Sequence, residues 1–418
     1  MKFLKLMAFI FILFVLSSCQ QEPEETEEIP EDLISDQEYM NVKSNLTVYD
    51  HIDGYEFDTG LFTTYKDDRY PSLSYVDVEA FLSLLSPGMN EYTLEKGESL
   101  TISAVLYGED ETEIFDVYRL SIDPTLNVLI YDDFNFYQAL SKPGYTSYTT
   151  DLVMTEFEST DTYPGITIDL NQYDMDILYS EGSYYIPLEL ANLILTSYSL
   201  NVYQMGDGLY IVDDETTLLE LIDKALIEST EADLPLIDFT YHFSALLFDY
   251  FYGLKDFQRV TSYLDKFEDK ELDQKSTFVS FDNAFFNEVL LMDDLHTQIL
   301  DFGLDRDDVT LTVFPTAYSR IREYFDAYVK HCELYETQDF TWTDKGDYYL
   351  LELNAFTNDL KDQLETTLGE AEPGKPIYID LTCNAGGYII SAIELLAYMT
   401  NDPITITYKN ATTGVIYH

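Results

Sequence analysis

The order of apolar runs in the segment 346–418 restricts the fold more than any other feature of the sequence. The run GDYYLLELNAF is followed by TNDLKDQLETTLGEA, PIYIDL, GGYIISAIELLAYMT and the hairpin-like ITITYKNATTGVIYH. The first and third runs are typical of strands, whereas the second and fourth have helical spacing. Strands that alternate with helices pair in parallel and are covered by those helices. We therefore expect an α/β layer here, with PIYIDL as a buried strand.

The turn after PIYIDL has the composition of an anion-binding loop. It contains Asn384, Gly386 and Gly387 and leads directly into a helical run. A strand that ends at two glycines before a helix directs several backbone N–H groups into one small space. Such groups stabilise the oxyanion of an acyl-transfer intermediate. An ordinary strand-to-helix turn is the alternative, and the loop by itself favours that alternative.

Two further segments favour an oxyanion-binding loop over an ordinary strand-to-helix turn. Upstream lies LLMDDLHTQIL, with Asp294 and His296 at an expected helix-to-strand boundary, and Phe356 follows the strand before the glycine loop. In this order the pieces resemble the tail-specific, or C-terminal-processing, serine peptidase family. The matching residues are Asp294-Leu295-His296-Thr297, Phe356, and Ile379-Asp380-Leu381 with Asn384 and Gly386-Gly387. The resemblance covers under half of the chain.

The resemblance implies a crotonase-like (ClpP-like) core that hydrolyses polypeptides through a serine nucleophile with a lysine base. Gly386 and Gly387 then become candidate oxyanion-hole residues, and His296 holds a motif position without a fixed catalytic role. No cofactor and no metal are implied.

The sequence also departs from the family pattern. In the family the nucleophile follows well beyond the glycine helix, and the sequence given ends at His418 before such an element. Ser391 lies in that helix, so we expect a packing hydroxyl, and Lys409 has the context of an exposed turn lysine. A nucleophilic pair of Cys383 and His296 is disfavoured, because a Cys beside an apolar strand usually packs.

We therefore expect a C-terminally truncated peptidase core, and no peptidase activity from residues 1–418 alone. Whether the chain is an enzyme stays open at this point. The alternative is a non-catalytic surface lipoprotein that binds extended peptides or small ligands. A purely structural envelope protein is a third, weaker hypothesis.

The N-terminus is typical of a secretory signal. Lys2 and Lys5 precede an apolar run from Leu6 to Leu16, and Leu-Ser-Ser-Cys ends at Cys19. The run is too short for a stable membrane-spanning helix. It resembles a bacterial lipoprotein signal, which implies cleavage before Cys19, a lipid on its sulfur and an extracytoplasmic location on the cell membrane. A plain signal peptide with an incidental Cys is the alternative.

Charge and cysteine content limit the partners. The chain has 22 Lys+Arg against 78 Asp+Glu and a net charge of −56, which repels nucleic acid and anionic lipid headgroups. We expect a polypeptide substrate and membrane attachment through the lipid on Cys19 only.

Cys332 and Cys383 would be able to pair outside the cell, but their spacing does not require a bridge, and we expect two buried free thiols.

The middle of the chain contains a weak internal repeat. RYPSLSYVDVEAFLSLL aligns with EGSYYIPLELANLILTSY, so that Tyr75 and Val76 match Tyr185 and Ile186. Each copy predicts a strand followed by a short helix. The units resemble the small repeats of the copper amine oxidase N-terminal-like family, without any implied copper or oxidase. Between the copies, period-two alternation predicts antiparallel strands.

The expected fold class is α+β and multidomain: small α+β repeats, a helical segment, and an incomplete crotonase-like α/β core. The expected boundaries are a signal peptide over 1–19, an acidic disordered tether over 20–45, two repeat units with antiparallel strands over 46–232, a helical segment with the DDLHT motif over 233–335, and the truncated core over 336–418.

Overall fold

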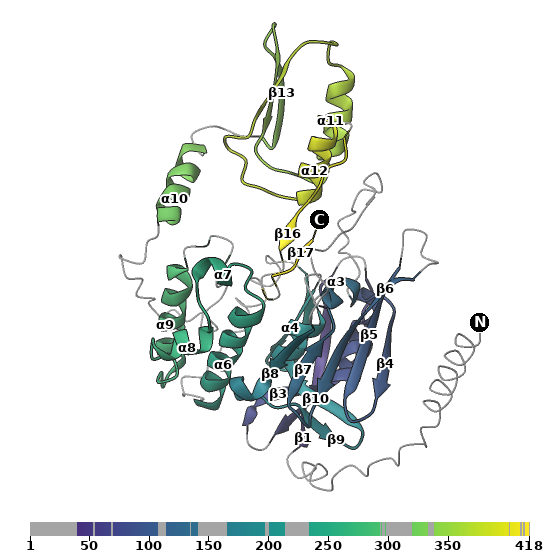
Figure 1. Ribbon diagram of the computed structural model, residues 1–418, viewed down its shortest axis with the longest axis vertical. Coiled ribbons are helices and arrows are strands. Elements are labelled where there is room, and N and C mark those ends of the chain that lie inside the picture. Colours follow the sequence, from purple (N-terminus) through teal and green to yellow (C-terminus); the bar gives the residue numbers. More distant parts are fainter. Residues whose placement is uncertain are drawn as a thin grey trace, which may run out of the picture. The chain divides into compact units, whose positions relative to one another are not determined.

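Helices and strands alternate through a mixed α/β chain with four separate sheets among the described residues (Figure 1). All of them belong to one unit, Tyr39–His418. The computed structural model describes residues 40–52, 55–67, 70–107, 114–133, 135–140, 165–196, 200–213, 234–292, 294, 297, 320–332, 338–400, 402–409, 412 and 414–417. The expected signal peptide and Cys19 therefore lie outside the described residues. The mixed α+β class predicted from the sequence is confirmed.

The largest sheet has seven strands in the order β11-β12-β1-β2-β3-β10-β9. Its strands are Met40–Asp50 (β1), Leu61–Asp67 (β2), Tyr70–Asp77 (β3), Leu178–Ser180 (β9), Ser183–Pro187 (β10), Asn201–Met205 (β11) and Gly208–Val212 (β12). Only β1 and β12 pair in parallel within this sheet. β1 begins inside the range 20–45 that was expected to be a tether.

The two repeat copies lie next to each other in this sheet. β3 and β10 pair antiparallel with Val76 opposite Ile186, the same two residues that align between the copies. Helix α2 (Val78–Leu85) follows β3, and helix α4 (Leu188–Leu195) follows β10. α2 contacts β10 while α4 contacts β3, and the helices contact each other. An approximate two-fold axis through the Val76 and Ile186 pair therefore relates the copies, and each helix covers the other copy's strand.

A second sheet of five antiparallel strands is formed mainly by the residues between the copies. Its order is β4-β5-β6-β7-β8, and the strands are Tyr92–Lys96, Leu100–Tyr107, Ile114–Asp123, Val128–Tyr131 and Ile166–Asp169. Leu100, Ile102 and Ala104 are fully buried, as the period-two alternation predicts. The connecting elements are Ser86–Gly88 (η2), Phe136–Leu140 (α3) and Leu170–Tyr173 (η3).

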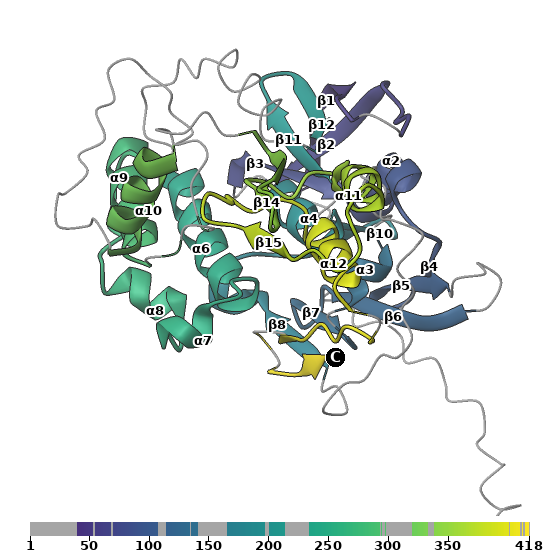
Figure 2. The ribbon, with the colours of Figure 1, turned by 90° about the horizontal axis from the view of Figure 1, so that it is seen from above.

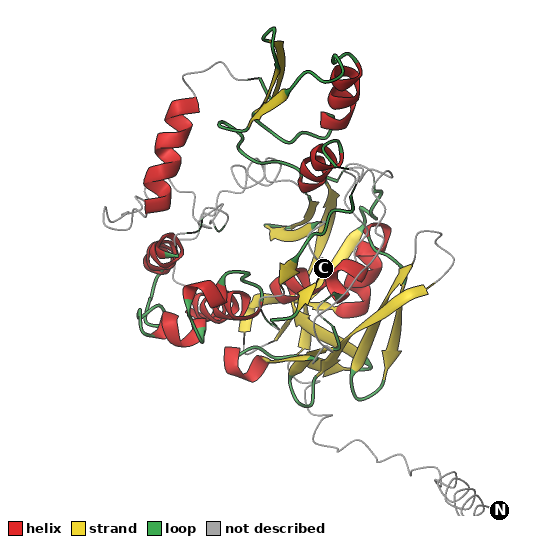
Figure 3. Cartoon of the chain, turned by 45° about the horizontal axis from the view of Figure 1, so that its top comes forward, coloured by secondary structure: helices red, strands yellow, loops and turns green. Residues whose placement is uncertain are grey.

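The described part of 234–332 consists mainly of helices (Figure 3). They are Leu234–Tyr250 (α6), Lys255–Gln258 (α7), Tyr263–Glu268 (α8), Phe278–Leu291 (α9) and Arg320–Cys332 (α10). Phe248 packs its ring against Tyr263, Phe267 and Phe285 at centroid distances of 5.2, 6.0 and 6.2 Å. The Tyr and Phe stripe is thus a core, and the predicted helices of this segment are confirmed.

The C-terminal segment forms a small α/β layer. Its strands are Phe340–Asp344 (β13), Tyr349–Leu353 (β14) and Ile377–Asp380 (β15). Its helices are Leu360–Gly369 (α11) and Ile389–Ala397 (α12). β14 and β15 pair in parallel, as predicted, whereas β13 was not anticipated and pairs antiparallel with β14. Figure 2 shows α11 and α12 beside these strands, and the two helices contact each other. Leu351, Leu353, Leu364 and Leu395 form its core.

The prediction that PIYIDL is a buried strand is wrong. Ile377 is 40% exposed and Tyr378 is 59% exposed. The reason is pairing: β15 is the last strand of the three-stranded sheet, so only β14 lies beside it among the described residues. The following hairpin is confirmed in a shorter form, with Tyr408–Lys409 (β16) antiparallel to Ile416–Tyr417 (β17).

Candidate functional site

The loop after β15 is held by its own side chains. The Thr382 N–H donates to Asp380 Oδ1 at 2.8 Å, and the Asn384 N–H donates to the Leu381 carbonyl at 3.1 Å. Hydrogen bonds from the Thr382 hydroxyl and amide hold the pKa of the half-buried Asp380 carboxyl below its usual value. The strand therefore stops at Asp380 in a defined turn.

Asn384 ties this turn to the end of β14. Its side-chain amide donates to the Leu353 carbonyl at 3.0 Å, and its side-chain oxygen accepts the Gly386 N–H at 2.8 Å. The Ala385 N–H donates to the Asn354 carbonyl at 3.0 Å. The neighbouring ends of two parallel strands are thus fastened to one another at the point where the glycines begin.

The structure brings Phe356 and the glycines into direct contact. The Phe356 N–H donates to the Gly386 carbonyl at 2.8 Å, and the Tyr388 N–H donates to the Phe356 carbonyl at 2.9 Å. Phe356 and Gly387 therefore form a parallel β-bridge. The motif position of Phe356 is explained by its backbone, which fixes the glycine loop.

Gly387 needs to be glycine at this bridge. Its φ is +127°, and a Cβ there would lie less than 3.0 Å from three backbone atoms of Phe356. In a parallel bridge of this kind the hydrogen bonds come from the residues on either side, so the Gly387 N–H points away from Phe356. That N–H donates to no atom of the described residues. Gly387 thus presents a free amide beside the end of a strand.

The two glycines differ in this respect. Gly386 also has a positive φ, +106°, with open space around it. Its N–H, however, is taken by the Asn384 side chain. Of the two candidate oxyanion-hole residues, Gly387 has the N–H that finds no acceptor among the described residues. Gly386 instead holds the loop, because its N–H donates to Asn384 and its carbonyl accepts from Phe356.

The expectation of two free thiols is wrong, because Cys332 and Cys383 form a disulfide with a Cα–Cα distance of 5.7 Å. That distance lies in the usual range for disulfides. Cys332 is the last residue of α10, so the bond fastens this helix to the loop three positions before Gly386. A disulfide-bonded Cys383 has no thiolate, which also removes the Cys383 and His296 nucleophilic pair in this state.

The other polar groups near the loop are already engaged. Ser391 is 4% exposed and donates to the Thr357 carbonyl at 2.8 Å, which confirms the expected packing role. Lys409 is exposed, as expected of a turn lysine, and pairs with Asp256 at 2.7 Å. The loop therefore presents one N–H, that of Gly387, without an acceptor among the described residues, while the Ser391 hydroxyl and the Cys383 sulfur are engaged elsewhere.

Only part of the DDLHT motif belongs to the described residues, and His296 lies outside them. The Thr297 hydroxyl donates to Asp294 Oδ2 at 2.6 Å, which closes a local turn after α9. Burial and then the Asp294 carboxylate raise the pKa of Tyr252. Within the described ranges, no hydrogen bond or ion pair joins this motif to Gly386 or Gly387.

Metal and membrane features were sought in the same ranges. The described part of the chain contains no group of three or more His, Cys, Asp or Glu side chains placed to hold a metal ion. Its helices include none that is long and apolar enough to cross a bilayer.

Comparisons with protein-family models, with curated proteins and with solved structures find no match to this chain. The geometry of the site and the motif resemblance therefore carry the functional argument.

Sequence reasoning missed the roles of the Asn384 side chain and Cys332. Asn384 was visible as a turn residue, and its position two residues before a glycine fits an Asx turn. The partner of Cys383 has no local cue, because the two cysteines are 51 positions apart.

Proposed function

We propose that this chain forms the oxyanion side of a tail-specific serine peptidase on a crotonase-like core. The free N–H of Gly387 is the single observation that carries the proposal. It lies beyond the end of a parallel strand, and the Phe356 backbone fixes its direction. An N–H held in this way stabilises the charge that develops on a carbonyl oxygen when a nucleophile attacks it.

The proposal assigns each neighbouring group a role. Gly387 donates to the carbonyl oxygen of the scissile peptide bond. Asn384 and Phe356 hold the loop so that no reorganisation is needed when charge appears. Ser391 is not the proposed nucleophile, because its hydroxyl donates to the Thr357 carbonyl.

The proposed location is the extracytoplasmic face of the cell membrane, with the chain attached through lipid on Cys19. The Cys332–Cys383 disulfide supports this part, since disulfides persist in oxidising compartments. The net charge of −56 supports a polypeptide substrate over a nucleic acid.

A second candidate is a non-catalytic lipoprotein that binds extended peptides. The exposed β15 favours it, because the outer edge of a strand pairs with an extended chain. Ile377 and Tyr378 would then contact the side chains of the bound peptide.

Reading the gene past codon 418 and assaying casein cleavage separates the two. The peptidase proposal expects an open frame with a later serine and lysine, and cleavage by the chain so encoded but not by residues 1–418. A stop codon directly after codon 418, together with peptide binding and no cleavage, favours the binding lipoprotein.

A further inference from the structure

A cavity of about 590 Å³ lies beside α6 and α7, away from the glycine loop in sequence. The residues that line it include Tyr252, Lys255, Arg259, Thr261 and Ser262. None of them takes part in the proposed peptidase chemistry.

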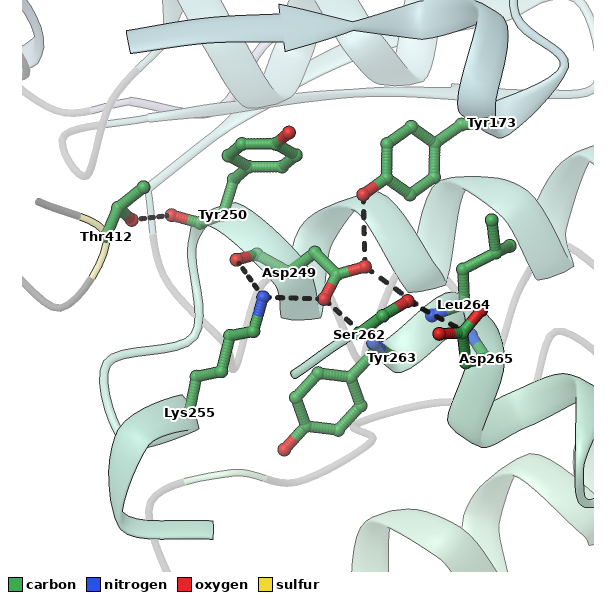
Figure 4. A network of polar contacts seen from close by, with 9 residues as sticks. All are labelled: Tyr173, Asp249, Tyr250, Lys255, Ser262, Tyr263, Leu264, Asp265 and Thr412. Atoms are coloured by element: carbon green, nitrogen blue, oxygen red, sulfur yellow. Dashed lines mark hydrogen bonds and ion pairs between the residues drawn. The ribbon is translucent and has the colours of Figure 1, made fainter. Parts of the chain in front are cut away.

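Asp249 is one of the residues that line this cavity, and the accepting positions of its carboxylate are occupied (Figure 4). It accepts from the Tyr173 hydroxyl at 3.0 Å, from the Tyr263 N–H at 2.7 Å and from the Leu264 N–H at 3.4 Å. Lys255 Nζ lies 2.8 Å from Asp249 Oδ1 and also donates to the Asp249 carbonyl at 3.1 Å. The buried carboxylate is therefore neutralised and has no capacity for a further donor.

The second carboxylate of the cavity, Asp256, is also paired, since Lys409 Nζ lies 2.7 Å from its Oδ2. The negative charges that line the cavity are thus compensated from within the chain. A ligand cation would have to displace a lysine at either one.

Donors, by contrast, are in excess. The Arg259 guanidinium makes no hydrogen bond or ion pair with any described residue, and neither does the Thr261 hydroxyl. Ser262 Oγ accepts the Asp265 N–H at 3.1 Å and keeps its own hydrogen for another acceptor. Lys255 uses two of its three N–H groups on Asp249.

One hydroxyl of the cavity is buried. Tyr252 lines the cavity and is 8% exposed. Its hydroxyl forms no hydrogen bond of full geometry with the described residues, but the side chains of Gln258, Thr297 and Asp294 lie close enough to affect its pKa. The hydroxyl therefore has polar neighbours of its own and is not counted among the donors of the cavity.

We propose that this cavity binds a small oxyanion, a carboxylate or a phosphate, between Arg259, Lys255 and the Thr261 hydroxyl. Guanidinium groups bind both anions through paired N–H donors. The chain has 22 Lys+Arg against 78 Asp+Glu. An arginine that pairs with no described carboxylate, in the same cavity as a lysine of fixed position, is therefore a local exception to the negative field of the chain. The backbone N–H groups at the start of α8 are not part of the site, because Asp249 accepts from them.

The test measures binding of inorganic phosphate and of acetate to the purified 1–418 chain, by calorimetry and by the thermal unfolding midpoint at constant ionic strength. Arg259→Gln removes the guanidinium from an exposed position, so the fold is retained. Lys345→Gln makes the same change in charge on an exposed turn and serves as the matched control. Thr261→Val provides a second, uncharged test.

Binding to the wild type and to Lys345→Gln, weakened about 10- to 100-fold in Arg259→Gln, is the expected result for loss of a charge-assisted hydrogen bond. Thr261→Val should weaken binding less. A response to phosphate alone identifies a phosphate site, and a response to acetate alone identifies a carboxylate site. Equal responses in Arg259→Gln and the wild type, or no binding of either anion at about 100-fold the concentration of the chain, overturn the proposal.

Discussion

Replacing Asp249 with alanine should lower the free energy of unfolding by about 3 kcal/mol, because the change leaves a lysine and three other donors without their acceptor. The side chain of Asp249 is 5% exposed, and that of Lys255 is 22% exposed. Loss of one partner from a buried ion pair costs roughly 3–5 kcal/mol. Water partly solvates the freed Lys255 ammonium, so the lower end of that range applies.

The matched control is Asp256→Ala, seven positions along the chain. Asp256 also pairs with a lysine, but its side chain is 65% exposed. Exposed ion pairs contribute little to stability, so this control should unfold at the same urea concentration as the wild type.

Urea unfolding followed by far-UV and near-UV circular dichroism measures the effect, since the tyrosines around Asp249 belong to the main core. In Asp249→Ala/Lys255→Met the unpaired charge is absent, and about 1 kcal/mol of the loss should return. If Asp249→Ala is no less stable than Asp256→Ala, the buried network does not hold α6, α7 and α8 together as described.

Three further predictions concern other parts of the molecule. Gly387→Ala should destabilise the C-terminal layer more than Gly374→Ala. Both glycines have positive φ, but only at Gly387 would an added Cβ lie closer than 3.0 Å to the backbone of another residue, Phe356. Hydrogen exchange of β14 and β15 measures this effect, and equal protection in the two variants would argue against the close approach. Reducing the Cys332–Cys383 disulfide, which spans 51 positions, should cost this part of the chain about 4 kcal/mol by loop entropy; protease resistance with and without a dithiol reductant tests it, and unchanged resistance is the contrary result. Burial raises the pKa of Glu189, whose Oε2 has no hydrogen-bond partner among the described residues. The folded state therefore binds this proton more tightly than the unfolded state, and ionisation at neutral pH destabilises it. Glu189→Gln should be more stable than the wild type at pH 7, and the gain should be lost below about pH 4, where the carboxyl is protonated in both states; a pH-independent gain would contradict the assignment.

The sequence predicts the local structure well wherever periodicity is strong. The repeat aligned Val76 with Ile186, and these residues lie opposite each other across β3 and β10. The apolar stripe of α6 and the alternation of β5 were sufficient to predict their buried faces. These features depend on residues close together in the chain.

Features that depend on pairing between distant segments were not predictable in the same way. The strand PIYIDL has the composition of a buried strand, but its exposure depends on which strands lie beside it. Whether two cysteines pair depends on where the end of α10 meets the glycine loop, which no spacing rule gives. In both cases the tertiary arrangement decides, and local composition is a weak guide.

The candidate sites show the same division. The glycine loop was found from composition, and the geometry then distinguished the free Gly387 N–H from the occupied Gly386 N–H. The cavity beside α6 was missed, because Asp249 receives the Tyr173 hydroxyl from 76 positions away. An acidic residue inside an aromatic helical stripe was the available cue, since buried carboxylates require partners.

Labelling with a fluorophosphonate serine probe, followed by mapping of the labelled residue, tests the central claim most directly. We predict no labelling of residues 1–418, labelling of one serine beyond His418 in the chain that the gene encodes, and a lower kcat when Gly387 is replaced by alanine in that chain. Alanine keeps the backbone N–H, but its Cβ would lie less than 3.0 Å from the Phe356 backbone and would move that N–H out of position. The Gly374→Ala variant should keep its kcat. Labelling of a serine within 1–418, or full activity of Gly387→Ala, would contradict the assignment of the Gly387 N–H as the oxyanion donor.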